Sequence, residues 1–149
     1  MTQVTTTRSP ASKAAPRQLT DGELAALAAF RAALRKFLAF SEQVAAAEGA
    51  TTQWYQALLV IKTFDSDEPI TVGELANQLI IRDHSAAELV TRLVGAKLVK
   101  RKSDPADRRR SHLLITPSGD RVLSALAVAH LERLREFQEA FLKPFKVNK

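Results

Sequence analysis

Apolar residues recur every three or four positions along most of this chain, which is the spacing of an amphipathic helix. The pattern predicts helices over about residues 20–47, 51–64, 71–79, 84–96 and 116–142. It is interrupted at residues 98–115, where two short segments flank a Ser-Asp-Pro-Ala-Asp turn and predict a β-hairpin. Strands are expected over residues 98–102 and 108–115, and Ile70 could add a short third strand. The expected fold class is mainly α with a small β-hairpin.

Polar residues at the helix starts support these boundaries. Thr20 and Thr71 are each followed three positions later by Glu, which is the capping-box pattern. Thr116 precedes Pro117, and proline is favoured at the first position of a helix. Asp83 is expected to cap the helix over residues 84–96. Residues 80–83 are then too few to form more than a tight turn, so the two flanking helices predict a helix-turn-helix.

The second helix of this pair has one apolar side and one polar side. Ala86, Leu89, Val90, Leu93 and Val94 fall on the side that would be buried. The residues predicted to face outward and to contact DNA bases or phosphates are His84, Ser85, Ala87, Glu88, Thr91 and Arg92. Pairing of Glu88 with Arg92, one helical turn apart, is at least as good an interpretation of that carboxylate. His84 has two further interpretations, a pocket residue or a plain exposed side chain.

The predicted hairpin carries most of the net charge of the protein. Residues 97–110 contain seven Lys and Arg against two Asp, a net of +5 out of +6 for the whole chain. A cationic hairpin beside an outward-facing helix is typical of a wing that contacts phosphates or a minor groove. The wing residues singled out as a DNA-binding set are Lys100, Arg101, Lys102, Asp107, Arg108, Arg109 and Arg110.

Residues 75–119 resemble the MarR-type winged-helix transcriptional regulators. The most specific match is the wing motif Asp104-Pro105-Ala106-Asp107-Arg108-Arg109, followed by Ile115-Thr116-Pro117-Ser118-Gly119. Leu75-Ala76, Leu93, Leu98-Val99 and Arg101 also match. One departure is Lys97, where the family usually has a glycine that caps the helix in the left-handed conformation. We expect either a similar backbone there, with some strain, or a different helix end.

The resemblance implies a sequence-specific DNA-binding regulator, more often a repressor, that acts as a homodimer on a pseudo-palindromic operator. It implies N- and C-terminal helices that intertwine across a two-fold axis, with Arg109 in the minor groove and Asp107 orienting it. It also implies a small aromatic or phenolic effector bound where the dimer helices meet the DNA-binding lobe. Residues available to line that pocket are Phe40, Trp54, Tyr55 and His84. For the three aromatic residues, core packing is the default interpretation. Binding to DNA without an effector is the other alternative.

The remaining composition excludes several classes of function. There is no Cys, which removes disulfides, thiolate metal sites and thiol redox sensing. No catalytic constellation is present, and the three His residues lie in different elements, so we expect no enzyme, no cofactor and no metal. The acidic run at residues 65–68 lacks the spacing of a calcium loop and is interpreted as a solvated loop. No segment is apolar enough for a membrane span, so a cytoplasmic location is expected.

The expected organisation is a disordered tail over residues 1–19, N-terminal helices over 20–64, the DNA-binding lobe over 65–116, and C-terminal dimerisation helices over 117–149. Two other classes remain open at this point. One is a basic RNA- or ribosome-associated module built on the same fold, although such modules usually stack bases on exposed aromatics. The other is a protein-interaction adaptor with a degenerate helix-turn-helix.

Overall fold

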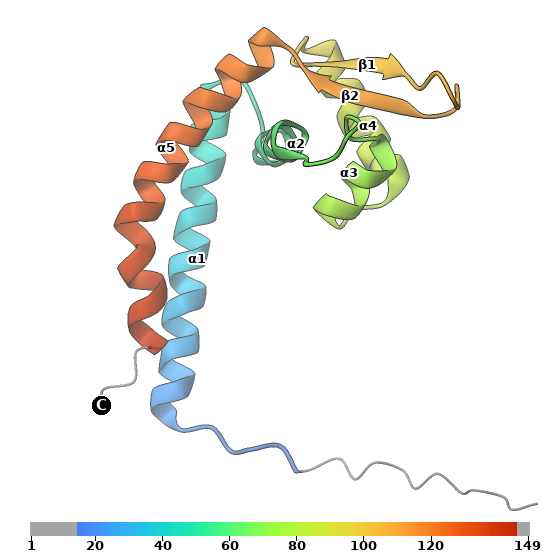
Figure 1. Cartoon of the computed structure of the whole chain (residues 1–149). Coiled ribbons are helices and arrows are strands. Elements are labelled where there is room, and N and C mark those ends of the chain that lie inside the picture. The colour runs from blue at the N-terminus through green and yellow to red at the C-terminus, as the bar shows by residue number, and fades with distance from the viewer. Residues whose placement is uncertain (1–14, 146–149) are drawn as a thin grey trace, which may run out of the picture.

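The computed structural model describes residues 15–145, which form two parts of different shape. The helices are α1 (Asp21–Ala47), α2 (Thr52–Thr63), α3 (Val72–Leu79), α4 (Asp83–Gly95) and α5 (Pro117–Leu142), followed by a 3-10 turn at Lys143–Phe145. The two strands are β1 (Val99–Ser103) and β2 (Ser111–Ile115). Helices α1 and α5 run antiparallel as a long pair, and α2, α3, α4 and the hairpin form a lobe at one end of it (Figure 1).

Four of the helices begin at a threonine whose hydroxyl accepts a backbone N–H, and the capping signals predict three of them, Thr20, Thr71 and Thr116. The capping boxes at Thr20 and Thr71 are both complete, with the Glu side chain returning to the backbone N–H of the threonine. The prediction for α4 is wrong by one position. Arg82 is the N-cap, without a side-chain hydrogen bond, and Asp83 is already the first helical residue. Its carboxylate still lies in the first turn, where it is favourable beside the positive end of the helix dipole.

One hydrophobic core holds the lobe together. Leu58 and Ile61 of α2 pack with Leu75 of α3, Leu93 of α4 and Leu113 of β2. The inward side of α4 is confirmed, because Ala86, Leu89, Val90 and Leu93 are all buried. Helix α2 therefore belongs to the core of the DNA-binding lobe as well as to the N-terminal helices, since Ala57, Leu58 and Ile61 are its buried residues.

The hairpin is shorter than the sequence predicts. Strand β1 pairs antiparallel with β2, from Val99 opposite Ile115 to Ser103 opposite Ser111. The prediction that the second strand begins at Arg108 is wrong, because residues 104–110 close a turn instead. The Arg110 N–H donates to the carbonyl of Asp107, and the Asp104 N–H donates to the carbonyl of Arg110. The expected third strand at Ile70 is reduced to a single bridge between Thr71 and His112, beside a hydrogen bond from Leu113 N–H to the Ile70 carbonyl.

The departure at Lys97 does not change how α4 ends. Lys97 takes the left-handed conformation with φ of +62°, and the N–H groups of Lys97 and Leu98 bond back to the carbonyls of Val94 and Leu93. This is a Schellman motif, which glycine would form with less steric cost than lysine. The expectation of a similar backbone is therefore confirmed. Ile80 is a second non-glycine residue at positive φ, in the turn between α3 and α4.

The start of α5 packs directly against the corner formed by Lys97 and Leu98, between α4 and β1. The Thr116 hydroxyl donates to the Lys97 carbonyl at 2.7 Å and accepts from the Gly119 N–H at 3.0 Å. A Cβ atom added to Gly119 would overlap the carbonyl oxygen of Leu98 and lie 2.7 Å from Cγ1 of Ile115. The glycine of the Thr-Pro-Ser-Gly motif is thus required by close backbone packing between α5 and the segment that leads from α4 into the wing.

The predicted tail lies largely outside the described residues, and residues 15–20 have no regular secondary structure. Helix α5 is continuous from Pro117 to Leu142. In the part of the chain that the structure describes, no helix is both long and apolar enough to cross a membrane.

The packing of Gly119 makes a testable prediction. Gly119→Ala should lower the free energy of unfolding by roughly 2–3 kcal/mol, because the added methyl group must push apart two pieces of backbone. Gly95→Ala is the matched control: nothing lies within 4 Å of its Cβ position, so alanine should be neutral or stabilise α4 by about 0.5–1 kcal/mol. Urea unfolding at fixed protein concentration compares the two. Equal stability of Gly119→Ala and the natural protein would contradict the packing argument.

Candidate nucleic-acid interface

Helix α4 presents a row of solvent-accessible side chains beside the wing. His84, Ala87, Glu88, Thr91 and Arg92 are exposed and Ser85 is partly exposed. The structure therefore places the whole predicted recognition set on the outward face of one helix. Ala87, Glu88, Thr91 and Arg92 line one shallow groove together with Arg101 of β1. The recognition helix and the wing thus contribute to a common surface.

Thr91 has a structural role that the sequence does not reveal. Its hydroxyl donates to the carbonyl of Ala87 at 2.9 Å and accepts from the Arg101 guanidinium at 3.0 Å. The threonine predicted as a base reader therefore has its one proton engaged in the helix and connects α4 to β1. Arg101 is correspondingly held against the recognition helix, so it is the wing cation whose position relative to α4 is fixed most directly.

Glu88 and Arg92 do not form the ion pair expected from their spacing. No ion pair involves either side chain among the residues 15–145. Both side chains are exposed on the same face as Thr91, so a guanidinium and a carboxylate are presented to a partner separately. A carboxylate in this position can accept from a cytosine amino group but repels phosphates.

The wing turn positions its arginines through backbone hydrogen bonds. The Asp107 carboxylate accepts from the backbone N–H of Arg109 at 3.0 Å, which is an Asx turn. No ion pair between Asp107 and the Arg109 guanidinium is present in the described chain. Asp107 thus contacts the main chain of Arg109 and not its guanidinium. That Asp107 orients the Arg109 side chain stays a prediction.

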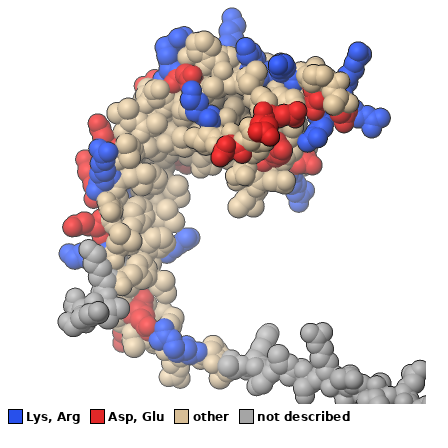
Figure 2. Space-filling view, in the orientation of Figure 1, with Lys and Arg blue, Asp and Glu red and all other residues tan. Residues whose placement is uncertain are grey.

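Arg109 and Arg110 turn back toward the helix-turn-helix. Both line a groove that also includes Arg101 of β1, Ala87 of α4, and Gly73 and Asn77 of α3. Lys100, Lys102 and Arg108 are exposed on the hairpin outside this groove. Figure 2 shows Lys and Arg side chains projecting from the end of the lobe where the hairpin lies in Figure 1.

A buried polar pair secures the base of the wing turn. His112 of β2 and Asp104 are 6% and 7% exposed, and the His112 Nε2 and Asp104 Oδ2 atoms are 3.2 Å apart. The His112 Nδ1–H donates to the carbonyl of Pro69 at 2.6 Å, since a carbonyl can only accept. Glu68 Oε2 lies 3.7 Å from His112 Nε2. The pair therefore joins the wing to the loop between α2 and α3.

The surroundings shift the pKa of His112 and the pKa of Asp104 in the directions that favour their charged forms. The hydrogen bond to the Pro69 carbonyl, aided by Asp104, raises the pKa of His112 above its ordinary value. The N–H of Ala106, which donates to Asp104 Oδ1, lowers the pKa of that carboxyl, and His112 lowers it further. No short-range pattern in the sequence predicts the cluster of Glu68, Asp104 and His112, because these residues are separated by 36 and 8 positions.

Two of the residues predicted for an effector pocket meet around a buried histidine. His130 of α5 is 3% exposed, stacks on Tyr55 with 4.1 Å between ring centroids, and lies edge-on to Phe40. Its Nε2 atom is 2.7 Å from the Ser41 hydroxyl, and its Nδ1–H donates to the Leu126 carbonyl. His130 is thus a packed histidine of the helix junction. Burial raises the pKa of the Tyr55 phenol.

The other two predicted pocket residues do not join this cluster. Trp54 packs against the core of the lobe, and His84 is exposed at the start of α4. Neither takes part in an aromatic contact with Phe40, Tyr55 or His130 within the described chain. The set is therefore divided between the junction of α1, α2 and α5, the lobe core and the recognition helix.

Comparisons with known proteins agree with this architecture. The family model described as MarR family matches residues 48–110, which include the helix-turn-helix and most of the wing. An uncharacterized HTH-type transcriptional regulator of Bacillus subtilis (strain 168), YsmB, is 32% identical over 72 residues, which are 48% of this chain and 49% of that protein. The chain thus matches about half the length of this curated relative.

Solved structures extend the likeness beyond the lobe. AbsC, a MarR family transcriptional regulator from Streptomyces coelicolor, superposes with a TM-score of 0.70 over 88% of this chain and 86% of its own, at 23% identity. Sco3205 from the same organism, also a MarR family transcriptional regulator and solved in complex with DNA, has a TM-score of 0.66 over 81% of this chain and 76% of its own, at 23% identity. At these identities the superpositions establish the fold, including the long α1 and α5 pair.

Proposed function

Since this chain is a MarR-type winged-helix protein, we propose that it is a homodimeric, sequence-specific DNA-binding transcriptional regulator located in the cytoplasm. The observation that carries the proposal is the fixed arrangement of α4 and the wing. The exposed face of the helix and seven Lys and Arg of residues 97–110 lie on adjoining surfaces, and Arg101 bonds to Thr91 across the junction. An α-helix fits the major groove of DNA, and a cationic hairpin beside it reaches the flanking backbone.

Helix α4 supplies the side chains for reading bases. Arg92 can bond to guanine, Ser85 can bond to a base edge or a phosphate, and Ala87 can contact a thymine methyl group. We assign Thr91 to the positioning of Arg101, because its hydroxyl already donates to the Ala87 carbonyl and accepts from the Arg101 guanidinium. His84, in the first turn of the helix, is placed for a phosphate or base contact.

The wing supplies most of the charge-dependent affinity. We assign Arg109 to the minor groove and Arg108, Arg110 and Lys102 to phosphates. An arginine in the minor groove responds to groove width and therefore favours A·T-rich flanks. The Asx turn supports this assignment, because it sets the direction in which the chain leaves Asp107 and so the direction of Arg109.

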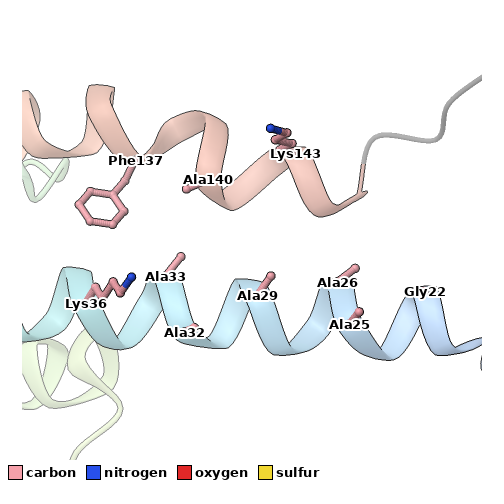
Figure 3. A pocket seen from close by; sticks show the side chains of 10 residues that line it. All are labelled: Gly22, Ala25, Ala26, Ala29, Ala32, Ala33, Lys36, Phe137, Ala140 and Lys143. Carbon is pink, nitrogen blue, oxygen red and sulfur yellow. The ribbon is translucent and has the colours of Figure 1, made fainter.

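The surface of the long helix pair supports a homodimer. Of the large apolar residues that are exposed in residues 15–145, all except Ile80 lie on or next to α1 and α5, including Leu24, Leu27, Leu131 and Leu134. A wide apolar surface of this kind marks an interface with another protein. Between the two helices lies a groove lined mainly by alanines of α1 and by Phe137 and Ala140 of α5 (Figure 3). A two-fold partner would cover these side chains with its own α1 and α5.

Repression is the regulatory outcome that needs no further component, because a dimer bound to a promoter keeps the transcription machinery from the same DNA. An effector that relieves repression would have to separate Tyr55 from His130 at the junction of α1, α2 and α5. Such a ligand would move α5 relative to α2, and α5 is joined to the wing through Thr116. An aromatic or phenolic molecule could replace the stacking that it disrupts.

An RNA-binding role is less well supported by the same surface. Residues 83–111, which form α4, β1 and the wing turn, contain no Phe, Trp or Tyr. Binding to single strands usually relies on stacking bases on such side chains. A protein-interaction role would not explain why the positive charge of the chain is concentrated on the wing.

A binding panel tests the proposed function. Duplex DNA from the region upstream of the gene, a scrambled duplex, the single strand and an RNA of equal length are compared by fluorescence anisotropy at two salt concentrations. The upstream duplex should bind most tightly, and affinity for every duplex should fall steeply with salt because phosphate contacts release counterions. Equal or tighter binding to RNA or to the single strand would contradict the proposal.

The Asx turn can be separated from the charge of Asp107 by two substitutions. Asp107→Ala should weaken binding by roughly fivefold, equivalent to about 1 kcal/mol, because the turn that directs Arg109 is lost. It should also reduce the preference for A·T-rich flanks, as Arg109→Ala should. Asp107→Asn keeps the oxygen that accepts from Arg109 N–H and removes the negative charge, so it should bind at least as tightly as the natural protein. If the alanine variant binds more tightly at every salt concentration, the charge alone matters and the turn does not position the arginine.

A further inference from the structure

The cluster of Glu68, Asp104 and His112 has a geometry that the DNA-binding function does not use. One ligand atom from each residue, two carboxylate oxygens and His112 Nε2, lie within 4.8 Å of one another. The measured separations from Nε2 are 3.2 Å to Asp104 and 3.7 Å to Glu68. Three ligands of a tetrahedral Zn²⁺ at bonds of about 2.0–2.1 Å are separated by about 3.3–3.4 Å. The two separations from His112 Nε2 are therefore close to those between ligands of a zinc site, and the two carboxylate oxygens lie no more than 4.8 Å apart.

Two of the three ligands are held in place by further hydrogen bonds. The Nδ1–H of His112 donates to the Pro69 carbonyl, which directs Nε2 toward the carboxylates. Oδ1 of Asp104 accepts from the Ala106 N–H, which directs Oδ2 toward His112. Histidines that bind metals almost always donate their other N–H to a carbonyl or carboxylate in this way. An ion would thus find two ligands already oriented.

The third ligand and the local charge also suit a divalent cation. Glu68 has a side chain that is 74% exposed, so it can move to bring its oxygen to ligand distance from both His112 Nε2 and the Asp104 carboxylate. With a neutral imidazole, the two carboxylates supply a charge of −2 that an ion of charge +2 compensates. Asp65 and Asp67 lie in the same exposed loop and add negative charge. Imidazole with carboxylates and no thiolate is a ligand set that suits Zn²⁺ and related transition metals.

We propose that Glu68, Asp104 and His112 form a binding site for a divalent transition metal, with Zn²⁺ as the ion of best fit. A water molecule completes the coordination. Bound there, the ion replaces the proton that otherwise lies between His112 and Asp104. It links the α2–α3 loop to the wing turn and fixes the wing relative to the helix-turn-helix. This inference is independent of DNA binding and concerns the free protein.

The test uses the full chain after EDTA treatment and dialysis, titrated with ZnCl₂ in a calorimeter at pH 7.5. One ion should bind per chain, and MgCl₂ and CaCl₂ should not compete at equal concentration. Co²⁺ from CoCl₂ should occupy the same site and give visible absorption bands as intense as those of tetrahedral Co²⁺. Adding ZnCl₂ should then remove these bands. Zinc should also slow trypsin cleavage after the wing residues Arg108, Arg109 and Arg110.

Matched substitutions distinguish coordination of Zn²⁺ by these side chains from a general attraction of Zn²⁺ to the acidic loop. Glu68→Gln should weaken Zn²⁺ binding by at least tenfold, whereas Asp65→Asn removes an equal charge from the same loop and should change it less than threefold. His112→Gln should abolish binding, and His84→Gln should leave it unchanged. Circular dichroism of the exposed-site variant Glu68→Gln confirms that its fold is retained.

Two results would overturn the proposal. One is the absence of calorimetric binding of Zn²⁺ to the natural protein. The other is an equal loss of affinity in Glu68→Gln and Asp65→Asn, which would reduce the cluster to a histidine–aspartate ion pair beside a charged loop.

Discussion

The close packing of Gly119 on the backbone of Leu98 is the contact on which the arrangement of this protein depends. It brings the first turn of α5 against the corner where α4 ends and β1 begins, and only a residue without a side chain fits there. Thr116 reinforces the corner, because its hydroxyl caps α5 and bonds to the Lys97 carbonyl. The recognition helix, the wing and the long helix therefore meet at one small set of backbone atoms. A change in the direction of α5 must move this corner, which provides a physical route between the proposed dimer interface and the proposed DNA-binding surface.

A second set of contacts fixes the orientation of the wing. In the middle of β1, Arg101 is joined to Thr91 of α4. Near its turn, His112 and Asp104 are held against the loop that precedes α3. Because a two-stranded hairpin alone is marginally stable, these connections are what convert a basic loop into a wing with a defined direction. The cationic residues beyond them remain exposed and available to a polyanion.

The sequence predicts best those features that arise from neighbours in the chain. The capping threonines and the apolar side of α4 follow from local patterns and were confirmed. At Lys97 the sequence left two helix ends open, and the structure has the left-handed one. The errors are also local in origin: Asp83 entered the helix instead of capping it, and Arg108 to Arg110 form a turn closed by Asp104 and Asp107.

The candidate site was only partly predictable for a different reason. Which outward side chains of α4 are free to contact a partner depends on contacts made elsewhere, and the bond from Arg101 engages Thr91. The cluster around His112 combines residues from a loop, a turn and a strand. No periodicity in the sequence relates these three positions, because the fold alone brings them together.

The central claim is that two copies of this chain read DNA together, each with one α4 and one wing. Hydroxyl-radical footprinting on the upstream duplex tests it most directly. The account predicts two protected half-sites related by a two-fold axis, about one helical turn or roughly 10 base pairs apart from centre to centre, each flanked by protection of the minor groove. A single short, asymmetric protected patch would contradict it.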